Sequence, residues 1–267
     1  MIWLYVCLGI AAGATAIGLF IYANNDWIKI TRHKFVCGTE KKFKIAHLSD
    51  LHGKSFGRKN CGLVCKIAAF KPDCIVITGD IIHRYTDKNK RVALELVSSL
   101  AAVAPVLFSS GNHEMRNKGY NFFRRDLTEA GAQVLDDRAV RIDGVTFAGL
   151  NCASQKNGSV FKIKENLTEF ECNAKVKILL AHKPQFAESY SPAGFDFILS
   201  GHAHGGQWRI PFTDIGFYAP GQGVFPKLTS GVHIFGESKL IISRGLGNSQ
   251  CPLRLFNRPE LVFIELE

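Results

Sequence analysis

The sequence lacks several features that would place it in other classes of protein. Its eight cysteines contain no CxxC pair, which argues against a Cys/His zinc finger, and their spacing does not resemble a secreted disulfide framework. It also has no internal repeat, no low-complexity tract and no long linker rich in proline or serine. With 267 residues, 46% of them hydrophobic, the chain is expected to keep reduced thiols and to bury one substantial core.

Charged side chains are missing from the stretch that runs from Ile2 to Asn25. As a helix this stretch would extend about 36 Å, which is long enough to cross the hydrocarbon core of a bilayer. No basic residue precedes it, as one normally would in a secretory signal peptide, although the small residues at 11–16 keep a cleavage site open as the alternative. We therefore predict an uncleaved transmembrane anchor over residues 1–26.

Basic residues follow the anchor and none precedes it. Lys29, Arg32 and Lys34 lie just after the apolar stretch, and Trp27 is placed like an aromatic residue of the membrane interface. The positive-inside rule then predicts a single-pass protein of the cell membrane whose remaining chain lies in the cytoplasm. We expect residues 27–41 to form a basic juxtamembrane segment.

The net charge of +10 is concentrated close to the anchor, because residues 29–71 contain eleven Lys or Arg and only two acidic residues. This excess favours contact with anionic headgroups of the inner leaflet, at up to about 1 kcal/mol per well-placed cation. A solvated basic face explains it equally well. A nucleic-acid groove is the weaker interpretation, because the basic residues are not interleaved with aromatic side chains that could stack on bases.

Seven side chains that can bind metal occur where apolar runs give way to polar loops: Asp50, His52, Asp80, Asn112, His182, His202 and His204. Runs such as Cys74 to Thr78 are typical of buried strands in an α/β fold. Such folds place their sites at the carboxyl ends of the strands. We therefore expect the seven side chains to gather along one edge of a sheet.

The chemical types in this set indicate which ions it suits. Two carboxylates, one amide oxygen and four imidazoles favour manganese, iron or zinc over calcium or magnesium. Seven ligands are too many for one tetrahedral zinc ion but suffice for two ions that share a carboxylate. We predict two divalent metal ions, manganese first, with zinc or iron as alternatives. Two ions about 3.5–4 Å apart can stabilise a phosphoryl group and activate water near neutral pH.

Five short motifs resemble the signature blocks of the calcineurin-like metallophosphoesterases: Asp50-Leu51-His52, Gly79-Asp80, Gly111-Asn112-His113-Glu114, Ala181-His182 and Gly201-His202-Ala203-His204. The resemblance covers residues 42–267, which we expect to be the catalytic domain. It implies an α/β fold, a four-layer α-β-β-α sandwich preceded here by the transmembrane helix. Motifs at 201–207, 243–247 and 257–260 resemble a membrane-anchored bacterial branch, some of whose members hydrolyse phosphodiesters or the pyrophosphate of UDP-2,3-diacylglucosamine.

The resemblance also implies a role for each residue that matches. One metal ion would be held by Asp50, His52 and His204, and the other by Asn112, His182 and His202, with Asp80 as the bridge. His113 would be the catalytic residue that donates a proton or hydrogen bond to the phosphoryl or leaving-group oxygen. The implied reaction is in-line attack on phosphorus by a metal-bound hydroxide. His83 departs from the family, where an acidic residue is frequent, and is interpreted as a loop histidine rather than a pocket residue.

Two further residues are candidates for substrate binding. Gln207 follows two glycines that allow close approach of a ligand to the backbone, and Arg244 lies in a glycine-containing loop and can bind phosphate through two nitrogens. For both, a tight turn with a surface side chain is the alternative. The aromatic and aliphatic residues between Pro211 and Pro226 fit either a lid or acyl-chain groove, or ordinary loop packing.

Together these observations predict a membrane-anchored phosphohydrolase with two metal ions, acting as a phosphodiesterase or pyrophosphatase at the inner leaflet. Its substrate would be a phosphodiester or pyrophosphate, including a lipid-linked one, and no nucleic acid or obligate protein partner is expected. The alternatives are UDP-2,3-diacylglucosamine hydrolysis in lipid A synthesis, a nuclease, and a non-catalytic metal-binding scaffold. A scaffold has no chemical need for the complete ligand set together with His113.

Overall fold

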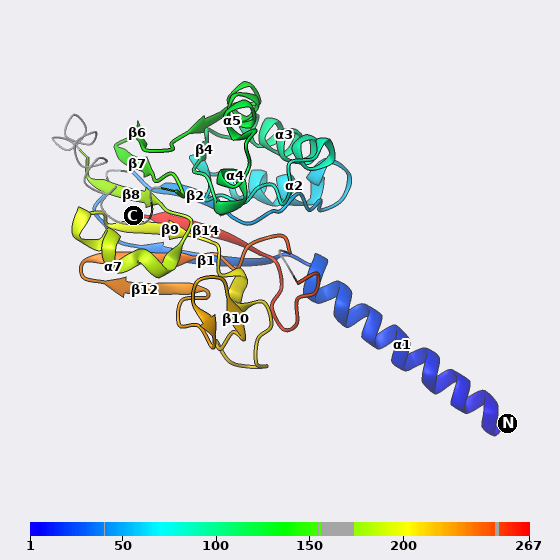
Figure 1. Cartoon of the computed structure of the whole chain (residues 1–267). Coiled ribbons are helices and arrows are strands. Elements are labelled where there is room, and N and C mark those ends of the chain that lie inside the picture. Colours follow the sequence, from blue (N-terminus) through cyan, green and yellow to red (C-terminus); the bar gives the residue numbers. More distant parts are fainter. Residues whose placement is uncertain (40, 154, 156–173, 249–250) are drawn as a thin grey trace.

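The computed structural model in Figure 1 describes all residues except 40, 154, 156–173 and 249–250. Its helices are α1 (Ile2–Asp26), α2 (Cys61–Phe70), α3 (Asp87–Ala101), α4 (Asn112–Met115), α5 (Tyr120–Glu129) and α7 (Ala187–Tyr190). Single 3₁₀ turns are η1 (Arg58–Asn60), η2 (Pro184–Phe186), η3 (Ser191–Ala193) and η4 (His204–Gly206).

Two six-stranded sheets form the body of the described chain. The first has the order β1 (Lys29–Phe35), β14 (Glu260–Leu266), β2 (Phe43–Leu48), β3 (Cys74–Ile77), β4 (Val106–Phe108), β5 (Ala132–Val134). The second has the order β12 (Gly231–Phe235), β13 (Ser238–Ile242), β9 (Phe197–Ser200), β8 (Val176–Leu180), β7 (Val145–Gly149), β6 (Arg138–Ile142). A small hairpin, β10 (Tyr218–Ala219) with β11 (Gly223–Val224), lies apart from both.

The inner strands of both sheets run parallel, so their carboxyl ends meet at one edge. In the first sheet β2, β3, β4 and β5 pair in parallel, and in the second β13, β9, β8 and β7 do so. Every residue of β3 is buried, as expected for a strand that is covered on both faces. This arrangement brings the loops that follow β2, β3, β4, β8 and β9 together.

Alternation along the strands builds the layers. In β3, Ile75 and Ile77 pack in a cluster with Leu63 of α2 and Leu96 of α3, while Val76 between them packs in the cluster shared by the two sheets. A third cluster lies between the second sheet and α7. Helix, sheet, sheet and helix therefore succeed one another, as Figure 1 shows, and the predicted four-layer α-β-β-α sandwich is confirmed.

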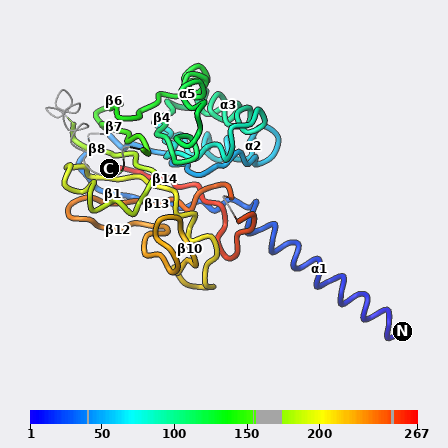
Figure 2. The backbone as a smooth tube through the Cα atoms, viewed as in Figure 1, coloured from blue at the N-terminus to red at the C-terminus, as the bar shows by residue number. Residues whose placement is uncertain are grey.

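Helix α1 extends away from this sandwich. Figure 2 shows its N-terminus at the far tip and the C-terminus of the chain within the folded body. The helix is long and apolar enough to cross a membrane, and no part of its most apolar window is buried in the protein. Only its last turn is covered, where Asn24 and Asn25 are buried.

Strand β1 differs from the sequence-based expectation. Residues 27–41 were predicted to form a basic juxtamembrane segment ahead of a domain that begins at residue 42, but Lys29–Phe35 form an edge strand parallel to β14. The exposed positions of this strand alternate, and Arg32 and Lys34 occupy two of them. Charged side chains on an edge strand discourage pairing with other chains, so the same basic residues have a structural use. The folded domain therefore includes β1.

Candidate metal centre

Polar residues follow five strands at the edge where the parallel strands end. In the first sheet, Asp50 and His52 follow β2, Asp80 follows β3, and Asn112 begins α4 after β4. In the second sheet, His182 follows β8, and His202 and His204 follow β9. Asp50, His52, Asp80, His202 and His204 all have positive φ angles, between 48° and 65°. Such angles are uncommon outside glycine, and their concentration here marks a backbone that is held in place by its surroundings.

The first group of donor atoms comes from Asp50, His52 and His204. The Nε2 atoms of the two imidazoles face each other at 3.1 Å, and Oδ1 of Asp50 lies 3.4 Å from Nε2 of His204. The other carboxylate oxygen of Asp50 accepts a hydrogen bond from the backbone N–H of His202 at 2.9 Å. Oδ1 of Asp50 therefore remains directed at the two ring nitrogens.

The second group comes from Asp80, His182 and His202, with Asn112 beside it. Nε2 of His182 lies 3.1 Å from Nδ1 of His202, 3.2 Å from Oδ1 of Asn112 and 3.3 Å from Oδ2 of Asp80. The Nδ1–H of His182 donates to the carbonyl oxygen of Thr78 at 2.7 Å. That bond directs Nε2 into the group, as in many histidine ligands of metals.

Asp80 lies between the two groups. Its Oδ2 atom is 3.3 Å from Nε2 of His182 in the second group and 3.8 Å from Nε2 of His52 in the first. Its Oδ1 atom accepts the backbone N–H of His113 at 2.8 Å, which fixes the orientation of the carboxylate. This position fits a carboxylate that is shared by two cations.

The donor set fits cations chemically. Oδ1 of Asp50 is buried and has no hydrogen-bond partner in the described chain, and neither does Nδ1 of His52. A buried carboxylate oxygen without a donor is strongly unfavourable unless a positive charge compensates it. Ring nitrogens that converge with carboxylate and amide oxygens supply the mixed donors that manganese, iron and zinc accept.

Burial and mutual charge set the protonation of these residues. Burial lowers the pKa of His52, His202 and His204 to about 3, so these imidazoles are neutral at pH 7 and can donate lone pairs. Burial also opposes a charge on His182, but the neighbouring Asp80 outweighs it and raises the pKa of His182 to about 9. Burial acts against ionisation of Asp80 too, yet His182 holds the pKa of that carboxyl well below its usual value. The site thus attracts positive charge.

His113 borders the two groups without joining either of the aspartate-containing clusters. Its Nδ1–H donates to the carbonyl oxygen of His83 at 2.8 Å, which leaves Nε2 on the side of the site, 3.9 Å from Oδ2 of Asp80. Its ring stacks on that of His83 with centroids 5.0 Å apart and meets the ring of His52 edge-on at 4.7 Å. The structure therefore places His83 at the rim of the site, whereas the sequence favoured a plain loop histidine.

Glu114 is a site residue for which sequence reasoning gave no role. It is fully buried, and its carboxylate accepts backbone N–H groups of Asp80, Ile82 and Gly111. Burial, and after it the charge of Asp80, raises the pKa of Glu114 to about 8. The side chain thereby ties the loop after β3 to the start of α4, which holds Asp80 and Asn112 in register.

Arg254 is a second residue that the sequence did not single out. Its side chain is fully buried, with one guanidinium nitrogen 3.5 Å from Nδ1 of His204 and bonded to the carbonyl oxygens of Arg244, at 2.9 Å, and Gly247, at 2.6 Å. Asn257 donates from Nδ2 to the carbonyl oxygen of His204 at 2.7 Å. The loop before β14 therefore supports His204 from behind, and its only sequence signal was the 257–260 motif.

The last turn of α1 is bonded to the same loop. Oδ1 of Asn25 accepts the backbone N–H of Arg254 at 2.9 Å and Nδ2 of Asn248 at 3.2 Å, and Nδ2 of Asn25 donates to the carbonyl oxygen of Arg254 at 3.3 Å. Oδ1 of Asn24 accepts the backbone N–H of Asn257 at 3.2 Å. Two buried carboxamides thus connect the apolar helix to the loop that supports His204.

The two predicted substrate contacts have other partners. The guanidinium of Arg244 lies 3.8 Å from Glu260 and 3.9 Å from Asp214, and its backbone N–H donates to Glu260. Nε2 of Gln207 donates to the carbonyl oxygens of Cys251 and Leu253 at 3.0 and 3.1 Å. In the described part of the chain, the Gln207 side chain braces a loop, Nε of Arg244 has no hydrogen-bond partner, and neither side chain joins the histidine–aspartate groups.

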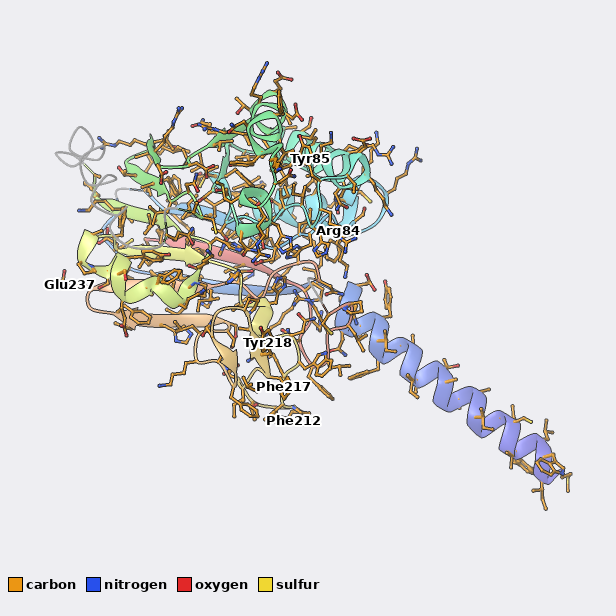
Figure 3. The ribbon with its side chains drawn as sticks, viewed as in Figure 1. Arg84, Tyr85, Phe212, Phe217, Tyr218 and Glu237 are labelled. Atoms are coloured by element: carbon orange, nitrogen blue, oxygen red, sulfur yellow. The ribbon has the colours of Figure 1, made fainter. Side chains whose placement is uncertain are left out.

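An open cleft of about 530 Å³ begins at His113. It is lined by residues of the loop after β3, of α4 and of the segment after α4: His83, Arg84, Tyr85, His113, Arg116, Asn117 and Lys118. Figure 3 labels Arg84 and Tyr85 on this side of the domain. Three of the lining side chains are cationic, which suits a substrate that carries negative charge next to the metal centre.

Comparison with known proteins agrees with this geometry. Residues 43–206 match the calcineurin-like phosphoesterase family. The chain is 29% identical over 270 residues to phosphodiesterase YaeI of Escherichia coli strain K12, covering 96% of this chain and 94% of that one. It is 26% identical over 235 residues to the uncharacterized metallophosphoesterase YkoQ of Bacillus subtilis strain 168, covering 85% and 84%.

A solved structure of TT1561 from Thermus thermophilus has the same fold, with a TM-score of 0.51 at 12% identity over 77% of this chain and 91% of that one. The family match includes the loops that carry Asp50 through His204, and the structure brings those side chains together in two adjoining groups. The chain therefore belongs to the calcineurin-like phosphoesterase family and is a metal-dependent phosphoester hydrolase.

Proposed function

We propose that the chain is a phosphodiesterase that uses two divalent ions, one held by Asp50, His52 and His204 and the other by Asn112, His182 and His202. The observation that carries this proposal is the position of Asp80, whose Oδ2 atom lies within 3.8 Å of ring nitrogens from both groups. When bound, such ions stabilise negative charge on a phosphoryl group and lower the pKa of water. Manganese is the preferred ion in this proposal, with zinc or iron as alternatives.

His113 is the proposed catalytic residue of the chain itself. Its Nδ1–H is engaged by the carbonyl oxygen of His83, so only Nε2 can exchange a proton with a bound substrate. Nε2 lies at the junction of the two groups and the cationic cleft. The side chain is thus held to donate a proton or hydrogen bond to an oxygen of the phosphoryl or leaving group.

The cationic cleft is the proposed binding site for the rest of the substrate. Arg116 and Lys118 line it next to His113, and neither belongs to the histidine–aspartate groups. We expect Arg116→Ala to raise KM for an anionic substrate more than it lowers kcat, because the charge acts on binding rather than on the reacting atoms. Arg125→Ala is the matched control, since Arg125 is an exposed arginine of α5 outside this cleft.

We also propose that α1 anchors the protein in the cell membrane with the folded domain in the cytoplasm. The length and exposure of α1 support anchoring, and Lys29, Arg32 and Lys34 after it support this orientation. Labelling of single-cysteine variants with membrane-impermeant reagents in intact cells tests the orientation. Labelling of Cys61, an exposed native cysteine of the domain, in unbroken cells would contradict it.

The reaction is tested by supplying purified full-length protein with Mn, Zn, Fe, Co or Ni and assaying bis-(4-nitrophenyl) phosphate. Ions bound per chain are counted on the same samples by mass spectrometry. Turnover that rises with occupancy to two ions supports the proposal. Full occupancy without turnover of this ester, of phosphomonoesters and of sugar-nucleotide lipids would show that the site binds metal without acting on these substrates.

A further inference from the structure

Eight large apolar side chains are exposed on the segment that connects η4 to β12. We call residues 208–225 the aromatic lobe. Phe212 is fully exposed, and seven others are 40–60% exposed: Trp208, Ile210, Ile215, Phe217, Tyr218, Val224 and Phe225. Figure 3 labels Phe212 at the outer end of the lobe, with Phe217 and Tyr218 between it and the sheets. A soluble surface rarely gathers so many apolar side chains without a partner.

The lobe is held rigidly from within. Arg209 is buried, and its guanidinium donates to the carbonyl oxygen of Gly205, to Ser230 and to Asp214, the last at 2.7 Å. The backbone N–H of Phe217 donates to the carbonyl oxygen of Trp208 at 2.7 Å. These hydrogen bonds hold the backbone of the lobe in place, and its aromatic side chains are exposed.

The lobe is continuous with the base of α1. Trp208 forms a bridge with Leu255 and donates from Nε1 to the carbonyl oxygen of Leu253 at 3.0 Å. The next residue, Phe256, is half exposed and meets Phe20 of α1 edge-on, with ring centroids 5.1 Å apart. Figures 1 and 2 show the stretch that precedes β14 between the lobe and the base of the helix.

We infer that the aromatic lobe inserts into the lipid headgroup region of the same bilayer that α1 enters. This inference rests on the proposed anchoring by α1. Tryptophan and tyrosine are favoured at that depth, because each places an apolar ring near the acyl chains while its polar group stays hydrated, and phenylalanine adds apolar area. The exposed carboxylate of Asp214 is compensated by the buried guanidinium of Arg209, so it does not bring an unpaired charge to the surface.

Insertion would set the position of the metal centre. The backbone N–H of Phe217 also donates to the carbonyl oxygen of Gly206, two residues after His204. The lobe is therefore bonded directly to the turn η4, which carries His204. Lipid contact on the lobe would hold the site close to the headgroups, where a phosphodiester attached to a lipid is presented.

The three tryptophans of the chain provide the test, since Trp3 is in α1, Trp27 follows it and Trp208 is in the lobe. Variants of the full-length protein that keep one tryptophan each are placed in phosphatidylcholine–phosphatidylglycerol vesicles with brominated acyl chains. We expect emission from Trp208 to be quenched, and more by bromine at shallow than at deep acyl positions. Adding Phe212→Ser and Phe225→Ser should reduce that quenching.

Emission from Trp208 that is unchanged by bromination would overturn the inference. A dimer in detergent, seen by light scattering, together with unquenched Trp208 would mean that a second copy covers the lobe instead. The Trp3 variant reports separately on the anchor. Unquenched Trp3 together with quenched Trp208 would refute the membrane-spanning helix and support insertion of the lobe. Quenched Trp3 together with unquenched Trp208 would support the membrane-spanning helix and refute insertion of the lobe.

Discussion

Asn25 is predicted to stabilise the folded domain although it belongs to the apolar helix. Asn25→Ala removes three hydrogen bonds to the loop before β14 and leaves the buried backbone N–H of Arg254 without an acceptor. A buried donor left unpaired costs about 1–3 kcal/mol, and each other hydrogen bond contributes about 0.5–1.5 kcal/mol. We expect the free energy of unfolding to fall by about 2–6 kcal/mol.

For a domain of this size, each kcal/mol shifts the unfolding temperature by about 2–4 °C, so Tm should fall by about 4–24 °C. Thermal unfolding of full-length protein in detergent measures this change. Thr15→Ala is the matched control, because the hydroxyl of Thr15 is exposed and bonds only to the carbonyl oxygen of Ala11 within α1. Equal Tm values for the two variants would refute the argument that the last turn of α1 supports the domain.

The same contacts distinguish two truncations of the anchor. A chain that begins at residue 24 keeps both buried carboxamides, whereas a chain that begins at residue 27 loses them. We expect the longer form to retain more activity and more metal at equal protein concentration, because Arg254 and Asn257 support His204. Truncation of α1 is therefore not a neutral way to obtain soluble protein.

Three further predictions concern the metal centre. Asp80→Ala should lose both bound ions and hydrolysis, and a variant with near-normal activity would exclude a shared carboxylate. His113→Ala should keep two ions but lose turnover by about 10²–10⁴-fold; loss of metal would instead make His113 a ligand. In chelator-treated protein, stability should fall as pH falls from 6.5 to 5.5. Between these pH values the unfolded chain takes up protons that the folded chain does not. Each buried histidine thereby lowers the free energy of unfolding by up to about 1.4 kcal/mol per pH unit. These histidines have pKa values lowered to about 3 by burial: His47, His52, His202 and His204. Glu114, with a pKa raised to about 8, and His182, with a pKa raised to about 9, act in the opposite direction as two groups against four. Urea midpoints that rise on acidification would contradict this.

The sequence predicted the strand ends and the donor atoms because both are encoded locally. A run such as Cys74 to Ile77 is apolar at every position, and Asp80 follows it within a few residues, so period and spacing suffice. Asp143-Gly144, a dipeptide that favours two-residue hairpin turns, likewise joins β6 to β7, so that Ile142 pairs with Val145.

What the sequence did not predict depends on residues that are far apart along the chain. Strand β1 looks like a basic flank of the anchor until its partner β14 is known, since Lys29 pairs with Glu260. The support of His204 by Arg254 and Asn25 likewise joins three distant segments through side-chain and backbone contacts that no periodicity encodes. The substrate contacts predicted for Gln207 and Arg244 stay predictions, because residue type suggested them and the structure shows only that Gln207 bonds to a neighbouring loop and that Arg244 lies 3.8 Å from Glu260.

The place of β14 between β1 and β2 has a consequence for biosynthesis. The ribosome delivers β1 and β2 early, but the strand that joins them follows only after the whole second sheet has been made. At a synthesis rate of about 5–20 residues per second, the edges of β1 and β2 that will pair with β14 stay unpaired for about ten seconds or more. If α1 inserts into the membrane as proposed, the nascent domain would mature while tethered, and a chaperone that shields β2 would have time to act.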